Sequence, residues 1–91
     1  MIPLNTPLVR VYGRTGCPPC KATTLKMASL GLGSSYIDVE TDLVAKAELE
    51  QRGFQSLPVV IVAMSDGGEY AWSGFRPDKI DELAKQMAAA A

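Results

Sequence analysis

Cys17 and Cys20 are the only two cysteines in this chain, and only Pro18 and Pro19 separate them. A β-rich run at 8–13 precedes the pair, and a helical pattern follows it. This order puts Cys17 at the start of a helix, where unpaired backbone N–H groups and the helix dipole stabilise a thiolate. Cys20 lies one turn further on, within reach of the Cys17 sulfur. The spacing therefore predicts a dithiol that oxidises reversibly to a disulfide.

Thiol–disulfide exchange gives the two thiols different roles. The Cys17 thiolate attacks a partner disulfide, and Cys20 then attacks the Cys17 sulfur, which releases the reduced partner. The two prolines fit the first helical turn, where a missing N–H costs nothing. They also leave only the Cys20 and Lys21 N–H groups as backbone donors near the sulfur. We expect Thr15, both prolines and Lys21 to tune the redox potential.

The composition argues against several other functions. The chain has no histidine, so the usual general base is missing and two cysteines cannot complete a four-ligand zinc site. A net charge of −1 gives no basic excess for binding nucleic acid. No apolar run approaches the roughly 20 residues that span a membrane, and the first seven residues do not resemble a signal peptide. We expect a cytoplasmic protein, where a catalytic disulfide is permitted and a structural one is rare.

The pattern of apolar and turn residues predicts an α/β fold of one domain over 1–91, with an irregular lead-in at 1–7 and a tail at 88–91. The first strand–helix–strand unit requires parallel strands, and the turn at 65–68 requires an antiparallel pair. The order β-α-β-α-β-β-α gives a mixed four-stranded sheet with helices on both faces. Strands are expected at 8–13, 35–39, 57–64 and 69–73, and helices at 18–30, 41–53 and from 77 onward. The apolar positions of the first helix are Ala22, Leu25, Ala28 and Leu32, and those of the last are Ile80, Leu83, Ala84 and Met87.

Pro58 heads an apolar strand, which has two explanations. The strand simply starts there, or the Leu57–Pro58 peptide bond is cis. In the second case the bend exposes the Leu57 backbone beside Cys17, ready to pair with an extended partner segment.

The segment 72–78 reads Trp-Ser-Gly-Phe-Arg-Pro-Asp. Its glycine and proline are typical of a strand end and a helix start. Trp72, Phe75 and Arg76 within one turn suggest an exposed aromatic pair beside an arginine, which would suit a docking patch. For Trp72 alone, a core position is the simpler interpretation.

Together these motifs resemble the NrdH-type redoxins, the glutaredoxin-like hydrogen donors of class Ib ribonucleotide reductase. The resemblance runs over about 8–83. It is carried by Gly16 to Cys20, Gly53-Phe54, Leu57 to Val60 and, most specifically, by the sequence Trp72, Ser73, Gly74, Phe75, Arg76, Pro77 and Asp78.

The resemblance implies a compact, glutaredoxin-like thioredoxin fold, with Cys17 as nucleophile, Cys20 as resolving thiol and Pro58 as the cis-proline. It implies reduction by thioredoxin reductase and not by glutathione, so that NADPH acts only indirectly. We also expect a monomer that binds no cofactor. The large subunit of class Ib ribonucleotide reductase would be the electron acceptor. The 72–78 turn, including Ser73, Gly74 and Pro77, would contact partners and replace the glutathione-holding residues of other glutaredoxins. Pro-Pro between the cysteines departs from the family's usual pattern.

Two alternatives stay open. Arg14 and Lys21 could attract the carboxylates of glutathione, which would make the chain a glutathione-dependent glutaredoxin. A non-catalytic binding module, or a carrier that holds an iron–sulfur cluster between two chains through Cys17, is the other class; the two prolines should hinder cluster docking.

Overall fold

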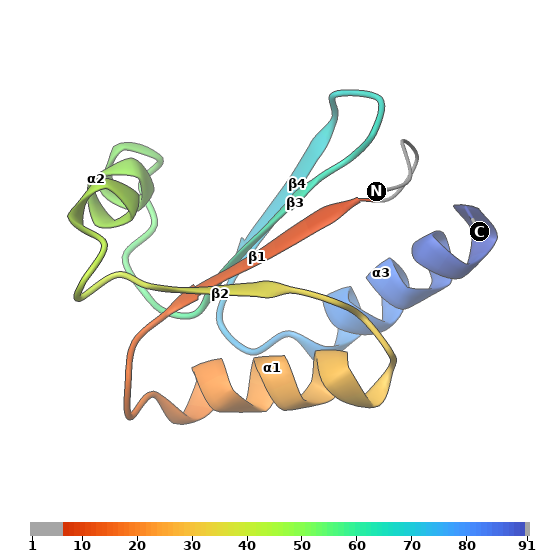
Figure 1. Cartoon of the computed structure of the whole chain (residues 1–91), viewed down its shortest axis with the longest axis horizontal. Helices are drawn as coiled ribbons and strands as arrows, with labels where there is room; N and C mark the ends of the chain where they lie inside the picture. The colour runs from red at the N-terminus through yellow and green to blue at the C-terminus, as the bar shows by residue number, and fades with distance from the viewer. Residues whose placement is uncertain (1–6, 91) are drawn as a thin grey trace.

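The elements follow one another in the order predicted from the sequence. The computed structural model describes residues 7–90, and the expectation for a lead-in falls almost entirely outside them. In chain order the elements are β1 (Leu8–Gly13), α1 (Pro18–Ser29), β2 (Ser35–Asp38), α2 (Leu43–Gln51), β3 (Val59–Ala63), β4 (Glu69–Ser73) and α3 (Pro77–Ala90) (Figure 1).

The four strands form one mixed sheet in the order β2-β1-β3-β4. β1 runs parallel to β2, with Val11 opposite Tyr36, because helix α1 returns the chain to the same end of the sheet. β1 and β4 both run antiparallel to β3, the latter through a tight turn in which Gly67 adopts a positive φ of 91°. The mixed sheet is therefore the one expected from the sequence.

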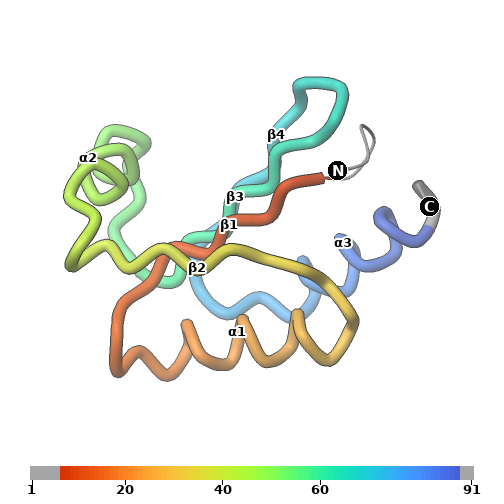
Figure 2. The backbone as a smooth tube through the Cα atoms, in the orientation of Figure 1, coloured from red at the N-terminus to blue at the C-terminus, as the bar shows by residue number. Residues whose placement is uncertain are grey.

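Helices cover both faces of the sheet (Figures 1 and 2). Alternate residues of the buried strands supply two separate apolar layers, since successive strand residues point to opposite faces. On the face of α1 and α3 lie Val9, Val11, Met27, Leu32, Val60, Val62, Trp72, Ile80 and Leu83. On the face of α2 lie Tyr12, Val39, Ala45, Leu49, Val59 and Ile61. The central strand β3 is buried on both sides, as its continuous apolar run predicts.

Several boundaries and one helix face differ from the sequence prediction. Leu25 and Ala28 are exposed, and α1 instead buries Cys20, Thr23 and Met27. The apolar spacing was misleading because α1 packs against the sheet with the face that begins at Cys20. β3 is shorter than predicted because Pro58 has no N–H to donate to the ladder.

The last helix matches the expectation for its inner face. Ile80 and Leu83 are buried, and Ala84 and Met87 pack against the same layer. The predicted tail at 88–91 is helical as far as Ala90. Across the described part of the chain, no helix is both long enough and apolar enough to span a membrane.

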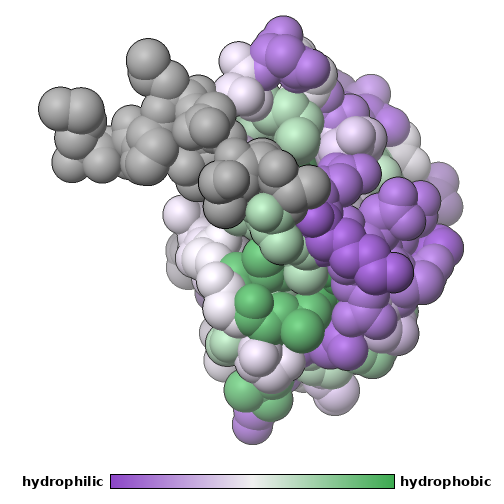
Figure 3. Space-filling model, turned by 90° about the vertical axis from the view of Figure 1, so that its right-hand side faces the viewer, coloured by the Kyte–Doolittle hydropathy of each residue, from purple (hydrophilic) through white to green (hydrophobic). Residues whose placement is uncertain are grey.

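The end of the molecule away from the Cys17 loop has its own surface character. Figure 3 views this end and shows apolar side chains gathered in one patch beside a band of polar residues. The loop between β1 and α1, which ends at Cys17, lies at the lower left of Figure 1. The reactive atoms and this apolar patch are thus at different ends of the molecule.

Candidate active site at the start of helix α1

Cys17 caps the helix that follows it. Its backbone is extended (φ −105°, ψ 101°), and its side chain accepts a hydrogen bond from the Cys20 N–H at 3.3 Å. Gly16 adopts a positive φ of 75° and turns the chain into the helix. Pro18 and Pro19 occupy the first two helical positions. Local sequence alone therefore explains why the sulfur sits at the positive end of the helix dipole.

The two sulfurs are joined in a disulfide, with the two Cα atoms 5.2 Å apart. The two residues differ in access to solvent, because Cys17 is 8% exposed and Cys20 is fully buried. Of the two residues, only Cys17 keeps some exposure to solvent, which favours attack by an incoming thiol on its sulfur. This asymmetry fits the predicted roles of nucleophile for Cys17 and resolving thiol for Cys20.

One expected donor is engaged elsewhere. The Lys21 N–H donates to the Cys17 carbonyl at 3.0 Å instead of to the sulfur, because it makes the first regular hydrogen bond of the helix. The Cys20 N–H is thus the backbone donor that the sulfur receives. Thr23, which is also fully buried, satisfies its hydroxyl by donating to the Pro19 carbonyl at 2.8 Å.

A groove of about 550 Å³ opens beside Cys17. Its lining includes Arg14 and Lys21, and within residues 7–90 neither side chain forms an ion pair. By contrast, Lys26 is paired with Asp81 across α1 and α3. The groove is therefore locally cationic on a chain whose net charge is −1. The other predicted loop residue, Thr15, donates to the Asp38 carboxylate at 3.4 Å, which is a weak contact.

Sequence reasoning missed two residues at this site, Gly13 and Tyr36. Tyr36 lines the groove, and its hydroxyl donates to the Arg14 carbonyl at 2.8 Å. A Cβ on Gly13 would lie 2.9 Å from the Cys20 sulfur and would overlap the Tyr36 hydroxyl. A glycine that ends a strand directly before a reactive loop is a signal for such a close approach, whereas nothing local points to Tyr36, 19 residues after Cys17 in the sequence.

The Leu57–Pro58 peptide bond is cis, as the second interpretation of Pro58 predicts; that the Leu57 backbone lies beside Cys17 stays a prediction. The Pro58 carbonyl accepts a hydrogen bond from the Gly74 N–H at 2.7 Å. This bond ties the predicted docking segment to the cis-proline, although 16 residues separate the two in sequence. Leu57 is half-buried, and no hydrogen bond to its backbone occurs within residues 7–90.

The prediction that Trp72 and Phe75 form an exposed aromatic pair is wrong for Trp72. Trp72 is buried in the layer under α1 and α3, because its position in β4 points to that face. Phe75, beyond the end of the strand, is 40% exposed. Arg76 is exposed and forms a two-point hydrogen bond with Asp78, at 2.9 Å and 3.1 Å. Ser73 and Gly74 are half-buried and Pro77 is exposed, so the accessible side chains of this segment are Phe75, Arg76 and Pro77.

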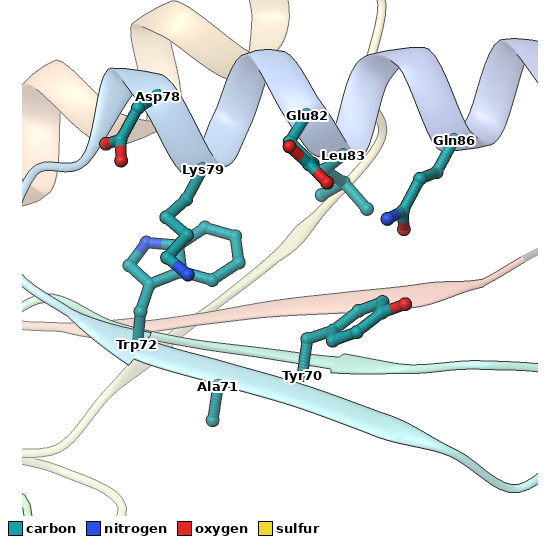
Figure 4. Close-up of a pocket in the computed structure, with 8 residues that line it drawn as sticks. All are labelled: Tyr70, Ala71, Trp72, Asp78, Lys79, Glu82, Leu83 and Gln86. Carbon is teal, nitrogen blue, oxygen red and sulfur yellow. The ribbon is translucent and has the colours of Figure 1, made fainter.

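A second hollow, of about 290 Å³, lies between β4 and α3 (Figure 4). Trp72 forms part of its floor, and within residues 7–90 its indole nitrogen has no hydrogen-bond partner. Lys79 and Glu82 reach over the hollow from the helix. This hollow shares no lining residue with the groove beside Cys17.

Comparison with known proteins agrees with this geometry. The model of the family Glutaredoxin matches residues 9–65. The glutaredoxin-like protein NrdH of Escherichia coli K12 is 39% identical over 75 residues, which cover 82% of this chain and 86% of that protein. The corresponding protein of Salmonella typhimurium is 37% identical over the same lengths. The chain belongs to the glutaredoxin family, in its NrdH-type branch.

A solved structure supports the same assignment for this NrdH-type redoxin. The E. coli NrdH-redoxin, described as having a thioredoxin-like activity profile, superposes with a TM-score of 0.74 at 39% identity. The match covers 82% of this chain and 92% of that one. Chloroplastic thioredoxin z, at 23% identity and a TM-score of 0.69, shares the fold. With its Cys-x-x-Cys pair at the start of α1, this redoxin is a thiol–disulfide oxidoreductase.

Proposed function

We propose that this redoxin is a dithiol electron carrier that is reduced by thioredoxin reductase and in turn reduces the large subunit of a class Ib ribonucleotide reductase. One observation carries the proposal: the accessible edge of the 72–78 turn lies next to the cis-proline through the Gly74–Pro58 hydrogen bond. The relatives that share this branch are named NrdH, and the E. coli protein is described as thioredoxin-like in its activity profile.

The cycle transfers two electrons and balances in each half. A thiolate of the reductase, regenerated by NADPH, attacks the Cys17 sulfur and breaks the Cys17–Cys20 bond; its second thiol then releases the dithiol redoxin. The Cys17 thiolate next attacks the acceptor disulfide and forms a mixed disulfide. Cys20 loses its proton, attacks Cys17, restores the intramolecular disulfide and leaves the acceptor as a dithiol.

The cis-proline region supports an extended partner segment as the substrate in both halves. The backbone of Leu57 has its polar groups available next to β3, which suits pairing with an extended strand. Phe75, the residue after the Gly74 that bonds to Pro58, offers an exposed apolar contact. The partner's disulfide would then enter beside Cys17, and the complex would form in the reducing cytoplasm between monomers.

One observation favours a second candidate, a glutathione-dependent reaction. Arg14 and Lys21 form no ion pair within residues 7–90 and line the groove next to Cys17. Two cations in such a groove suit the carboxylates of a tripeptide. Against this candidate, Phe75 and Arg76 occupy the turn where an acidic side chain would be needed for the tripeptide's amino group.

A single coupled assay separates the candidates. Insulin is the disulfide substrate, and NADPH is supplied either with thioredoxin reductase or with glutathione and glutathione reductase. We expect turnover with thioredoxin reductase and at most trace turnover with glutathione. Turnover only with glutathione and its reductase would replace the proposal with the second candidate. To test the acceptor, the purified large subunit of a class Ib ribonucleotide reductase takes the place of insulin in the same assay.

A further inference from the structure

The Tyr36 side chain and the Cys20 sulfur both lie close to Gly13. A Cβ on Gly13 would lie 2.8 Å from the Tyr36 ring carbon that bears the hydroxyl and 2.9 Å from the Cys20 sulfur. The phenol and the sulfur therefore approach each other across a residue that has no side chain. Any other residue at this position would push one of them away, since real Cβ atoms do not come that close to other heavy atoms.

The sheet explains why Tyr36 reaches this point. Tyr36 is opposite Val11 in the parallel ladder, and Val11 points to the face covered by α1. Gly13 is two residues further along β1 and faces the same way. Because β2 is an edge strand, Tyr36 as a whole is 45% exposed, although its hydroxyl reaches the redox loop.

The hydroxyl makes a second, separate contact. It donates to the Arg14 carbonyl at 2.8 Å, three residues before Cys17. Burial raises the pKa of Tyr36, and Asp38 adds to the rise, so the phenol keeps its proton at neutral pH and remains a donor. The loop that leads into the helix is thus fastened to β2 at this carbonyl.

We propose that Tyr36 is a positioning residue for disulfide exchange: its ring shields the Cys20 sulfur from incoming thiols, and its hydroxyl holds the loop that presents Cys17. The inference rests on the exchange chemistry of the Cys17–Cys20 pair and does not depend on which reductase or acceptor is used.

The shield decides which sulfur is attacked. An incoming thiolate forms a bond to the Cys17 sulfur, the Cys17–Cys20 bond breaks, and the electron pair leaves on Cys20, which takes a proton from solvent. Attack on Cys20 would instead join the incoming group to a fully buried sulfur and leave Cys17 as the thiolate. With Tyr36 in place only the first course is open, so Cys20 stays free to resolve mixed disulfides at Cys17.

The test of the shield uses the full chain with Cys17→Ser, in which Cys20 is the single thiol. The alkylation rate of Cys20 by iodoacetamide is followed by mass spectrometry. Removing the ring with Tyr36→Ala should raise the alkylation rate at least about tenfold, because iodoacetamide then reaches Cys20 without waiting for a local opening of the structure. Tyr36→Phe keeps the ring and should stay within about twofold. Tyr70→Ala is the matched control, since Tyr70 is 46% exposed and lies on the opposite edge strand; it should leave the rate unchanged.

The test of the hydroxyl uses Cys20→Ser, in which Cys17 is the single thiol. Here Tyr36→Phe should shift the midpoint of the pH–alkylation profile of Cys17, whereas Tyr70→Phe should not. Circular dichroism verifies folding, and Tyr36→Leu replaces Tyr36→Ala if the latter does not fold. If Cys20 alkylation were unchanged in the folded variant that lacks the ring, the ring would not shield Cys20. If the pH–alkylation profile of Cys17 did not move in Tyr36→Phe, the hydroxyl would not hold the loop that presents Cys17. Neither assay contains a reductase or an acceptor protein, so failure of the proposed function would leave both results interpretable.

Discussion

The loops that precede α1 and α3 are built to the same local plan, yet only one of them carries a reactive atom. Each follows a strand, turns at a glycine with positive φ (75° at Gly16, 85° at Gly74), and enters its helix at a proline. The carbonyl before that proline accepts the first helical hydrogen bond, from the Lys21 N–H at 3.0 Å in one loop and from the Ile80 N–H at 3.1 Å in the other. Cys17 and Arg76 therefore occupy equivalent positions.

The two loops differ in what surrounds the equivalent side chains. Cys17 is nearly buried, and its sulfur faces the first turn of α1. The Arg76 side chain is 47% exposed and pairs with Asp78 at the surface. The same local pattern thus produces a nearly buried sulfur in one loop and a solvated charge in the other. A helix start alone therefore does not make a reactive site.

The largest expected effect comes from replacing the two equivalent residues with serine. Cys17→Ser should lower insulin reduction by at least about a thousandfold, because the attacking thiolate is lost. Arg76→Ser should keep the chemistry and at most raise KM for protein partners. If Arg76→Ser were as inactive as Cys17→Ser, the difference drawn between the loops would fail.

Large losses of stability should follow truncation of Trp72 but not of Phe75. Trp72→Ala should lower the free energy of unfolding by about 3–5 kcal/mol, because it empties a buried aromatic site. Phe75→Ala should cost less than about 1 kcal/mol, since the ring is 40% exposed, while raising KM for a protein disulfide. Urea unfolding measures the stability losses, and the coupled assay measures KM. A small stability loss for Trp72→Ala would contradict its core position and favour a role for Trp72 in docking.

Equal and moderate losses should come from the two turn glycines. Gly16→Ala and Gly74→Ala should each cost about 1–2 kcal/mol, because a Cβ has free space at both but an L residue disfavours positive φ. Gly16→Ala should also change the alkylation rate of Cys17, whereas Gly74→Ala should act on KM. Gly33→Ala is the control: its φ is not positive and its surroundings are open, so unfolding should shift little. Unequal stability losses at the two turns would argue against the shared plan.

The smallest expected effect concerns the Arg76–Asp78 pair. The hydrogen bond from Arg76 lowers the pKa of the Asp78 carboxyl below its ordinary value. The pair therefore stabilises the fold at pH values above the unfolded-state pKa of Asp78, and this contribution is lost as the pH falls through the lower pKa of the folded state. Asp78→Asn should therefore lower the unfolding midpoint slightly at neutral pH and not at all in strong acid. The difference in unfolding midpoint between Asp78→Asn and the parent protein should therefore shrink as the pH falls. A difference that grew on acidification would contradict the sign of this prediction.

Local sequence was sufficient where neighbouring residues decide the outcome. The cysteine spacing and the two prolines predict Cys17 as the helix cap, because the cap, the missing N–H groups and the thiol all lie within five residues. The turn at 65–68 likewise predicts the β3–β4 hairpin, because two-residue turns join only antiparallel strands.

Contacts between distant segments could not be predicted in this way. Leu25 and Met27 have similar apolar character, and only docking against the sheet buries Met27 and leaves Leu25 60% exposed. Trp72 is buried because β4 turns that side toward α3. Gly13 offered a local signal, but its partner Tyr36 comes from another strand.

The sequence was thus enough to specify the order of the elements, the reactive pair and the family, since each depends on short-range spacing or on a motif read along the chain. Only the tertiary structure decided which cysteine keeps exposure to solvent, which aromatic residue is exposed, and which side chain comes close to Gly13 together with the Cys20 sulfur. The physical reason is that exposure and contact depend on how β1, β2 and α1 pack together, and that packing brings together residues with no common local signal.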